Sequence, residues 1–258
     1  MTNFIQAYHT DVGIRKQKNQ DSILLQGMKR DDKDILIAVM CDGMGGMDKG
    51  ELASATVVRA FGEWFRLDYV HDPNLYDADR LYKQWAEIIA DCNERMIAYG
   101  KRENIQLGTT MTAVMVQSDG RYFIAHVGDT RAYYVGDQLL QLTEDQTLVA
   151  REVRLGNMTE EQAKTDKRRS VLLQCIGINR VVEPQFLMGN LPPGQALLLC
   201  SDGFRHVISE VELFNGLLPA KFRSNDDIKQ ELIRLIELNK QRGETDNISA
   251  IYIKRLSE

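Results

Sequence analysis

Short runs of apolar residues, bounded by glycine and aspartate turns, recur along most of the chain. The runs are rich in Ile, Val, Leu, Tyr and Phe, which is typical of β-strands. They predict strands at residues 4–8, 22–26, 35–40, 110–117, 121–127, 132–135, 196–200 and 248–253. The turn at residues 118–120 predicts a hairpin between two of these strands.

Apolar positions at helical spacing interrupt the strand pattern in three places. They predict helices over residues 50–66, over residues 78–102, and from Ser224 to the glycine at position 243. In the second helix, Leu81, Trp85 and Ile89 lie on one face. Since strands mostly follow strands, the order favours an α+β fold with antiparallel sheets and outer helices over a doubly wound parallel sheet.

Residues 147–170 differ from the rest of the chain because they are charged and helix-prone, with few apolar anchors. Two interpretations stay open from the residues themselves. The segment is either a solvated excursion on the surface or a mobile flap beside a functional site.

Composition limits the class of protein. The 258 residues show no repeat or linker, which predicts a single domain over residues 1–258. A net charge of −5 argues against binding to nucleic acid or to an anionic membrane, because both need a basic face. The apolar stretch at residues 35–41 is too short to span a bilayer, and the N-terminus carries no targeting pattern. Scattered cysteines predict buried, reduced thiols in a cytoplasmic protein.

The positions of five aspartates carry the chemical information. Each lies where a predicted strand begins or ends: Asp21, Asp42, Asp129, Asp202 and Asp246. A single aspartate there is ordinarily a turn or cap residue. Five gathered at one sheet edge would repel one another and would stay ionised only beside cations. All-oxygen ligands favour Mg²⁺ or Mn²⁺, and the histidines are too scattered for a zinc site.

The run Asp42-Gly43-Met44-Gly45-Gly46 does not have the order of a phosphate-binding loop. It places a carboxylate next to the unhindered carbonyl of Gly43, a pair that suits one metal ion bridged to a second.

The chain resembles the metal-dependent protein phosphatases of the 2C type, and its bacterial branch in particular. The matching motifs follow the family order from about residue 8 to residue 253. They are Thr10-Asp11-Val12-Gly13, Asn19-Gln20-Asp21, Asp42-Gly43-Met44-Gly45-Gly46, Gly50-Glu51-x-Ala53-Ser54, Gly108-Thr109-Thr110, Gly128-Asp129-Thr130-Arg131, Leu142-Thr143-x-Asp145, Cys200-Ser201-Asp202-Gly203 and Asp246-Asn247.

The resemblance implies a fold and a metal centre. The fold would be a central antiparallel β-sandwich flanked by antiparallel helix pairs, in four layers (αββα), with residues 147–170 as a variable flap. Asp42 would bridge two Mn²⁺ or Mg²⁺ ions, the Gly43 carbonyl would complete the first site, and Asp202 with Asp246 would hold the second ion.

Two further ligands are expected. Asp21 is one candidate, and Asp129 with Asp202 would offer a weaker third site. His206 stands where relatives often carry another aspartate, which leaves occupancy of that third site open.

The resemblance also implies hydrolysis of phosphoserine and phosphothreonine in proteins, by attack of a water that bridges the two ions. Arg15 or Lys16 would bind the phosphate, and Arg15 is favoured for its bidentate geometry. The expected partners are phosphorylated proteins and a cognate Ser/Thr protein kinase. One alternative is a catalytically silent member that binds a phosphorylated partner, and another is a hydrolase of a different phosphoester, such as a nuclease. The presence of Asp42, Asp202 and Asp246 argues against the former, and the acidic chain argues against the latter.

Overall fold

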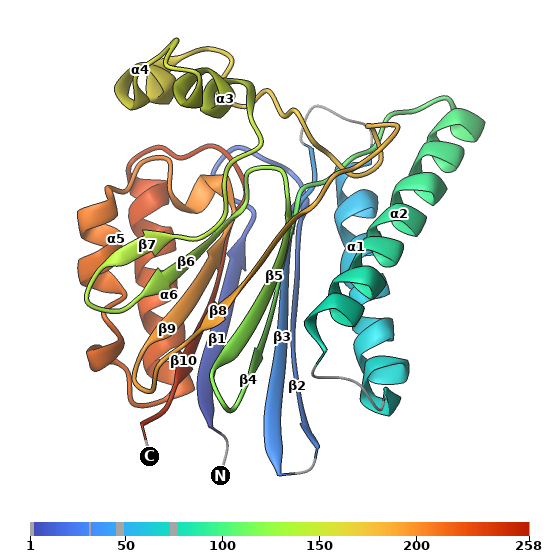
Figure 1. The fold of residues 1–258 in the computed structure, drawn as a ribbon. Helices are drawn as coiled ribbons and strands as arrows, with labels where there is room; N and C mark the ends of the chain where they lie inside the picture. The colour runs from blue at the N-terminus through green and yellow to red at the C-terminus, as the bar shows by residue number, and fades with distance from the viewer. Residues whose placement is uncertain (1–2, 31, 45–48, 73–76, 258) are drawn as a thin grey trace.

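Two five-stranded antiparallel sheets form the centre of the protein in the computed structural model, which describes residues 3–30, 32–44, 49–72 and 77–257 (Figure 1). The strands are β1 (Phe4–Asp11), β2 (Asp21–Arg30), β3 (Lys33–Asp42), β4 (Met111–Gln117), β5 (Arg121–Val127), β6 (Arg131–Val135), β7 (Leu139–Gln141), β8 (Gln185–Asn190), β9 (Ala196–Cys200) and β10 (Ile248–Arg255). One sheet has the order β1-β10-β9-β6-β7 and the other β2-β3-β4-β5-β8.

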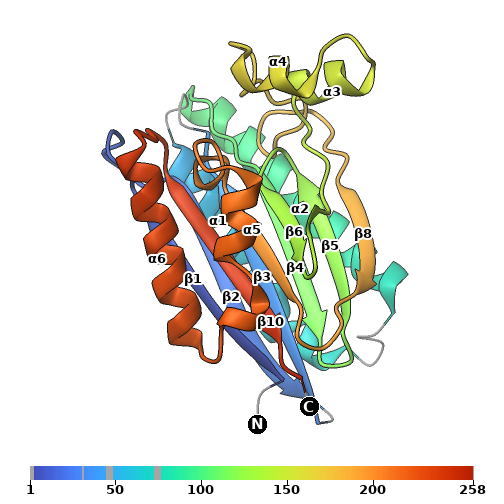
Figure 2. The same ribbon diagram turned by 90° about the vertical axis from the view of Figure 1, so that its left-hand side faces the viewer.

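Helices cover the outer face of each sheet. The α-helices of the described residues are α1 (Gly50–Leu67), α2 (Ala78–Glu103), α3 (Leu148–Arg154), α4 (Glu160–Thr165), α5 (Glu210–Gly216) and α6 (Asn225–Gln241), and short 3-10 turns lie at Tyr69–His71, Asp202–Phe204 and Pro219–Lys221. Helices α1 and α2 lie on the outside of the sheet that contains β3, and α5 and α6 lie on the outside of the other sheet (Figures 1 and 2).

The alternation of side chains along β3 explains the layers. Ile35 and Ile37 pack in the hydrophobic cluster formed with α1 and α2, whereas Leu36 and Met40 pack in the cluster between the two sheets. Both faces of this strand are therefore buried, which produces its unbroken apolar sequence. The predicted α+β fold with an αββα sandwich is confirmed.

Three elements were not predicted from the sequence: β7, β8 and α5. Strand β8 lies at a sheet edge and pairs only with β5 among the described strands, and Met188 on it is 65% exposed. Its apolar residues are consecutive and do not alternate with polar ones, so the sequence pattern does not indicate a strand with one buried face. Helix α5 is too short to show helical periodicity, although Ser209 and Glu212 form a capping box at its start that does mark it in the sequence.

The two ends of the sandwich differ in character. Both chain termini lie at one end, and α3 and α4, within the predicted flap at residues 147–170, lie beyond the other (Figures 1 and 2). Backbone hydrogen bonds from Leu148 to Val171 (2.8 Å) and from Leu173 to Gln146 (2.7 Å) join the two ends of this segment at its base. No described helix is both long enough and apolar enough to cross a membrane.

Candidate active site

The five predicted aspartates gather at the end of the sandwich below α3 and α4. Asp21 begins β2 and Asp42 ends β3, and the two residues are direct partners in the antiparallel pairing. Asp129 follows β5, Asp202 follows β9, and Asp246 directly precedes Asn247 and β10. The strand ends thus bring together residues that lie far apart in the sequence.

Burial and mutual repulsion make three of these carboxyl groups, those of Asp21, Asp42 and Asp129, difficult to ionise. Burial raises the pKa of Asp21 to about 7, and the nearby charge of Asp202 adds to this effect. Burial also raises the pKa of Asp42 well above its usual value, with further contributions from the charges of Asp21 and Asp202. Burial and the charge of Asp202 raise the pKa of Asp129 to about 7. Bound cations would lower these pKa values and allow the carboxylates to stay ionised together.

The donor chemistry at this end fits hard cations. Asp202 Oδ1 is buried and accepts no hydrogen bond from any described residue, so its lone pairs are free to bind a cation. Oxygen ligands of this type suit Mg²⁺ or Mn²⁺. Within the described ranges, however, no three Asp, Glu, His or Cys side chains converge into a ready-made metal site.

Backbone contacts fix the position of Asp42 and Gly43. Thr109 Oγ1 donates to the Asp42 carbonyl (2.9 Å), and the Asp42 N–H donates to Thr110 Oγ1 (3.0 Å). A Cβ at Gly43 would lie 2.3 Å from the Gly50 carbonyl oxygen, so no other residue fits there. The Gly-Thr-Thr motif therefore supports the Asp-Gly motif directly. Gly45 and Gly46 of the latter lie outside the described residues.

The loop at residues 12–20 carries both predicted phosphate-binding residues, and the side chain of Asn247 binds its backbone at three positions. Asn247 Nδ2 donates to the carbonyls of Val12 (2.9 Å) and Lys18 (3.1 Å), and Asn247 Oδ1 accepts from the Gln20 N–H (2.9 Å). Gly13 lies in the left-handed region at φ +76°, and a Cβ there would lie 2.2 Å from the Asp246 carbonyl oxygen. These contacts join the loop to the Asp-Asn motif at residues 246–247.

The loop brings Lys16 into the cluster and leaves Arg15 outside it. Lys16 Nζ lies 2.9 Å from Asp246 Oδ1, whereas Arg15 is exposed to solvent. Of the two residues predicted to bind phosphate, Lys16 is thus the one whose side chain reaches the aspartates.

Comparisons with known proteins agree with this geometry. The protein phosphatase 2C family profile matches residues 9–251. The chain belongs to the protein phosphatase 2C family. It is 36% identical to a Streptococcus pyogenes protein assigned to the protein phosphatase 2C type, over 96% of each chain. This membership confirms the resemblance carried by the motifs and places the chain in an enzyme family of phosphatases.

Solved structures of bacterial phosphatases share the fold. The serine/threonine phosphatase Stp1 of Staphylococcus aureus superposes with a TM-score of 0.84 at 27% identity, covering 96% of this chain and 94% of that one. The catalytic domain of the serine/threonine protein phosphatase PstP, in complex with two manganese ions, superposes with a TM-score of 0.79 at 27% identity, covering 98% and 99%. A relative with this fold therefore holds the pair of ions that the sequence predicts here.

The 2C-family site in this chain contains a histidine between two carboxylates. His206 Nε2 lies 3.4 Å from Asp202 Oδ2, and His206 Nδ1 lies 3.4 Å from Glu244 Oε2. Burial opposes ionisation of the imidazole, but the Glu244 hydrogen bond and the Asp202 charge outweigh it and raise the pKa of His206. Sequence reasoning noted His206 only as a departure at the third metal site. It missed Glu244, which belongs to none of the motifs.

A largely buried ion-pair network of Arg131, Asp145 and Arg205 holds the backbone at Asp129. Arg131 donates to both carboxylate oxygens of Asp145 (2.7 and 2.8 Å), and Arg205 donates to the Asp129 carbonyl (3.1 Å) and contacts Asp145 (3.4 Å). Arg131 and Asp145 were found as motif residues, but their pairing was not predicted. Arg205, next to the Ser-Asp-Gly motif, was missed.

The residue that precedes the flap, Gln146, is bonded to the neighbour of Asp129, Gly128. The Gln146 N–H donates to the Gly128 carbonyl (2.8 Å), and the Gly128 N–H donates to Gln146 Oε1 (2.9 Å). Lys167 and Arg169 on the flap are exposed. The structure thus locates α3 and α4 of this segment at the same end as the aspartates, and its role as a mobile flap stays a prediction.

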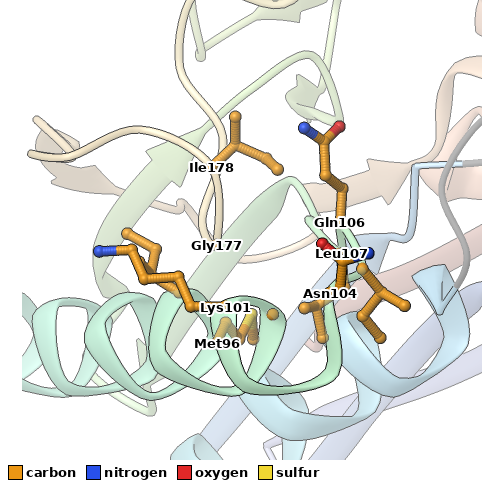
Figure 3. Close-up of a pocket in the computed structure, with 10 residues that line it drawn as sticks. Met96, Lys101, Asn104, Gln106, Leu107, Gly177 and Ile178 are labelled. Atoms are coloured by element: carbon orange, nitrogen blue, oxygen red, sulfur yellow. The ribbon is translucent and has the colours of Figure 1, made fainter.

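A separate cavity of about 580 Å³ lies where the end of α2 meets the segment containing Gly177 and Ile178 (Figure 3). Its other lining residues include Met96, Lys101 and Gln106. None of the predicted site residues lines it, so we assign it no part in the chemistry.

Proposed function

We propose that this chain, as a single catalytic domain over residues 1–258, is a metal-dependent serine/threonine protein phosphatase. It would release phosphate from phosphoserine and phosphothreonine in proteins. The observation that carries the proposal is the gathering of five aspartates at one end of a 2C-type sandwich, with the buried Asp202 Oδ1 left without a hydrogen-bond donor among the described residues.

The proposed ligand set follows the strand ends. Asp42 and the Gly43 carbonyl would hold one Mn²⁺ or Mg²⁺ ion, with Asp42 shared with a second ion held by Asp202 and Asp246. When bound, the ions would supply an activated water for attack on phosphorus and positive charge for the phosphoryl oxygens. The manganese pair in the PstP structure supports this assignment.

Two other aspartates complete the proposed centre. Asp21 faces Asp42 across the β2–β3 pairing and is suited to bind a metal-held water or to ligate directly. Asp129 with Asp202 would form a third, weaker site. His206, at the position where relatives often carry a further aspartate, lies beside Asp202 and would leave that site one carboxylate short.

The remaining roles fall to residues that position these groups and the substrate. Lys16 is the first candidate for the cation that orients the phosphate, with Arg15 as the second, because only the former is shown reaching the aspartates. Thr109 and Thr110 hold the Asp42 backbone and thereby aim its carboxylate. Arg205 holds the backbone of Asp129.

The proposed substrate is a phosphorylated protein, and a cognate Ser/Thr protein kinase would supply it. Exposed flap residues such as Lys167 and Arg169 lie at the end of the molecule where such a substrate would arrive. We place the activity in the cytoplasm, a location that the four buried, unpaired cysteines support.

The direct test measures phosphate release from a phosphothreonine peptide with Mn²⁺ and with excess EDTA, beside cleavage of a single-stranded oligonucleotide. We expect metal-dependent release from the peptide and no cleavage of the oligonucleotide. Folded, Mn²⁺-loaded protein without peptide turnover would support the silent, binding-only alternative. Faster cleavage of the oligonucleotide would support a nuclease.

A further inference from the structure

The position of Lys16 has a consequence beyond phosphate binding. Its ammonium group lies 2.9 Å from Asp246 Oδ1, and the two side chains are 30% and 38% exposed. Asp246 is one of the proposed ligands of the second ion. Lys16 therefore contacts a carboxylate that the proposed metal centre also requires.

The attraction extends beyond this single contact. Besides its 2.9 Å contact with Asp246, the Lys16 ammonium experiences the charges of Asp42 and Asp202. The ammonium is thus attracted to three of the carboxylates proposed as metal ligands. A divalent cation placed among the same carboxylates would repel it.

The loop fixes where the lysine begins, while its side chain can still leave the cluster. Asn247 binds the backbone at Val12, Lys18 and Gln20, which anchors the loop on both sides of Lys16. The side chain has a flexible four-carbon stem and an ammonium group with no fixed bonding plane. It can exchange Asp246 for solvent or for a phosphate without moving the backbone.

We propose that Lys16 is an internal cation that holds Asp246 while the metal ions are absent and that the second ion must displace. This inference rests on the proposed two-ion centre. It follows that Lys16 weakens metal binding and stabilises the metal-free protein. Displacement also frees the ammonium group for substrate phosphate only once the metal site is filled.

The test compares Mn²⁺ binding to EDTA-stripped wild-type protein, Lys16→Gln and Lys18→Gln by titration calorimetry. Lys18 is the matched control, because it lies on the same loop, carries the same charge and pairs with Glu51 (2.8 Å) instead of an aspartate of the cluster. We expect Lys16→Gln to bind Mn²⁺ about fivefold more tightly than wild type, as for loss of a half-exposed ion pair. Lys18→Gln should bind as wild type does.

A second measurement requires no metal. Lys16→Gln should lower the Tm of the metal-free protein, and the same substitution should have no such effect in an Asp246→Asn background, because the contact is already lost. An equal effect in both backgrounds would contradict the direct contact.

The outcomes separate the two proposals. Equal Mn²⁺ affinities in all three proteins, or an equal gain in Lys18→Gln, would overturn the role of Lys16 and leave the metal centre intact. Wild-type protein that binds no Mn²⁺ would overturn the proposed function and this inference with it.

Discussion

Replacing Asp145 with asparagine should destabilise the protein strongly, because two largely buried arginines depend on its charge. Its side chain is 12% exposed, and those of Arg131 and Arg205 are 19% and 14% exposed. Burial favours the neutral acid, but the charge of Arg205 and the hydrogen bonds from Arg131 outweigh it and lower the pKa of Asp145. Asparagine preserves the shape of the side chain and leaves both guanidinium groups without their counter-charge.

Removal of one partner from a buried ion pair costs about 3–5 kcal/mol. The matched control is Asp119→Asn, which breaks the exposed pair with Arg121 in the β4–β5 turn, where the side chains are 37% and 42% exposed. That change should cost less than about 1 kcal/mol. The assay is urea unfolding of both variants and wild type at pH 7. A loss for Asp145→Asn no larger than the loss for Asp119→Asn would refute the reasoning.

Two further predictions concern the site. Asp21 and Asp129 have pKa values of about 7 in the folded protein and about 3.9 when unfolded, so the metal-free protein should lose stability as pH rises from 4 to 7, and Mn²⁺ should remove this loss. Urea unfolding across pH 5–7.5, with and without Mn²⁺, checks both expectations. A free energy of unfolding that does not change with pH in the metal-free protein would contradict the raised pKa values of the cluster. Gly13→Ala should reduce phosphatase activity at least tenfold and lower the Tm, because the new Cβ would meet the Asp246 carbonyl. Gly156 has a similar φ of +74° but open space around it, so Gly156→Ala should lower the free energy of unfolding by only about 1 kcal/mol and leave activity unchanged. Equal effects of the two substitutions would contradict the close approach at Gly13.

The sequence predicted the framework of the site because that framework depends on local patterns. The apolar run through β3 ends at Asp42, and the run through β9 ends just before Asp202. Strand ends of a sandwich must lie at one end or the other, so the acidic cluster followed from strand periodicity and turn chemistry. The helix start at Ser224 was also local, since its capping box with Asp227 lies within four residues.

What the sequence could not predict depends on contacts between distant residues. The side chain of Lys16 reaches the aspartates and that of Arg15 does not. The conformation of their loop depends on Gly13 and on hydrogen bonds from Asn247, which lies more than 230 residues away in the sequence. The pairing of Arg131 with Asp145 is likewise a tertiary contact. Strand β8 forms because β5 offers it a partner, and its own residues carry no alternation.

The central claim is that cations held by carboxylates drive phosphoester hydrolysis. Substitution of Asp202 tests this claim most directly, because Asp202 is a proposed ligand of the second ion and of the third site. The measurement is Mn²⁺-dependent phosphate release from a phosphothreonine peptide by wild type, Asp202→Asn and the control Asp119→Asn, each confirmed to be folded. We predict that Asp202→Asn loses at least a hundredfold in kcat/KM, while Asp119→Asn retains wild-type turnover. Undiminished turnover by Asp202→Asn, or wild-type turnover that persists in EDTA, would contradict the account.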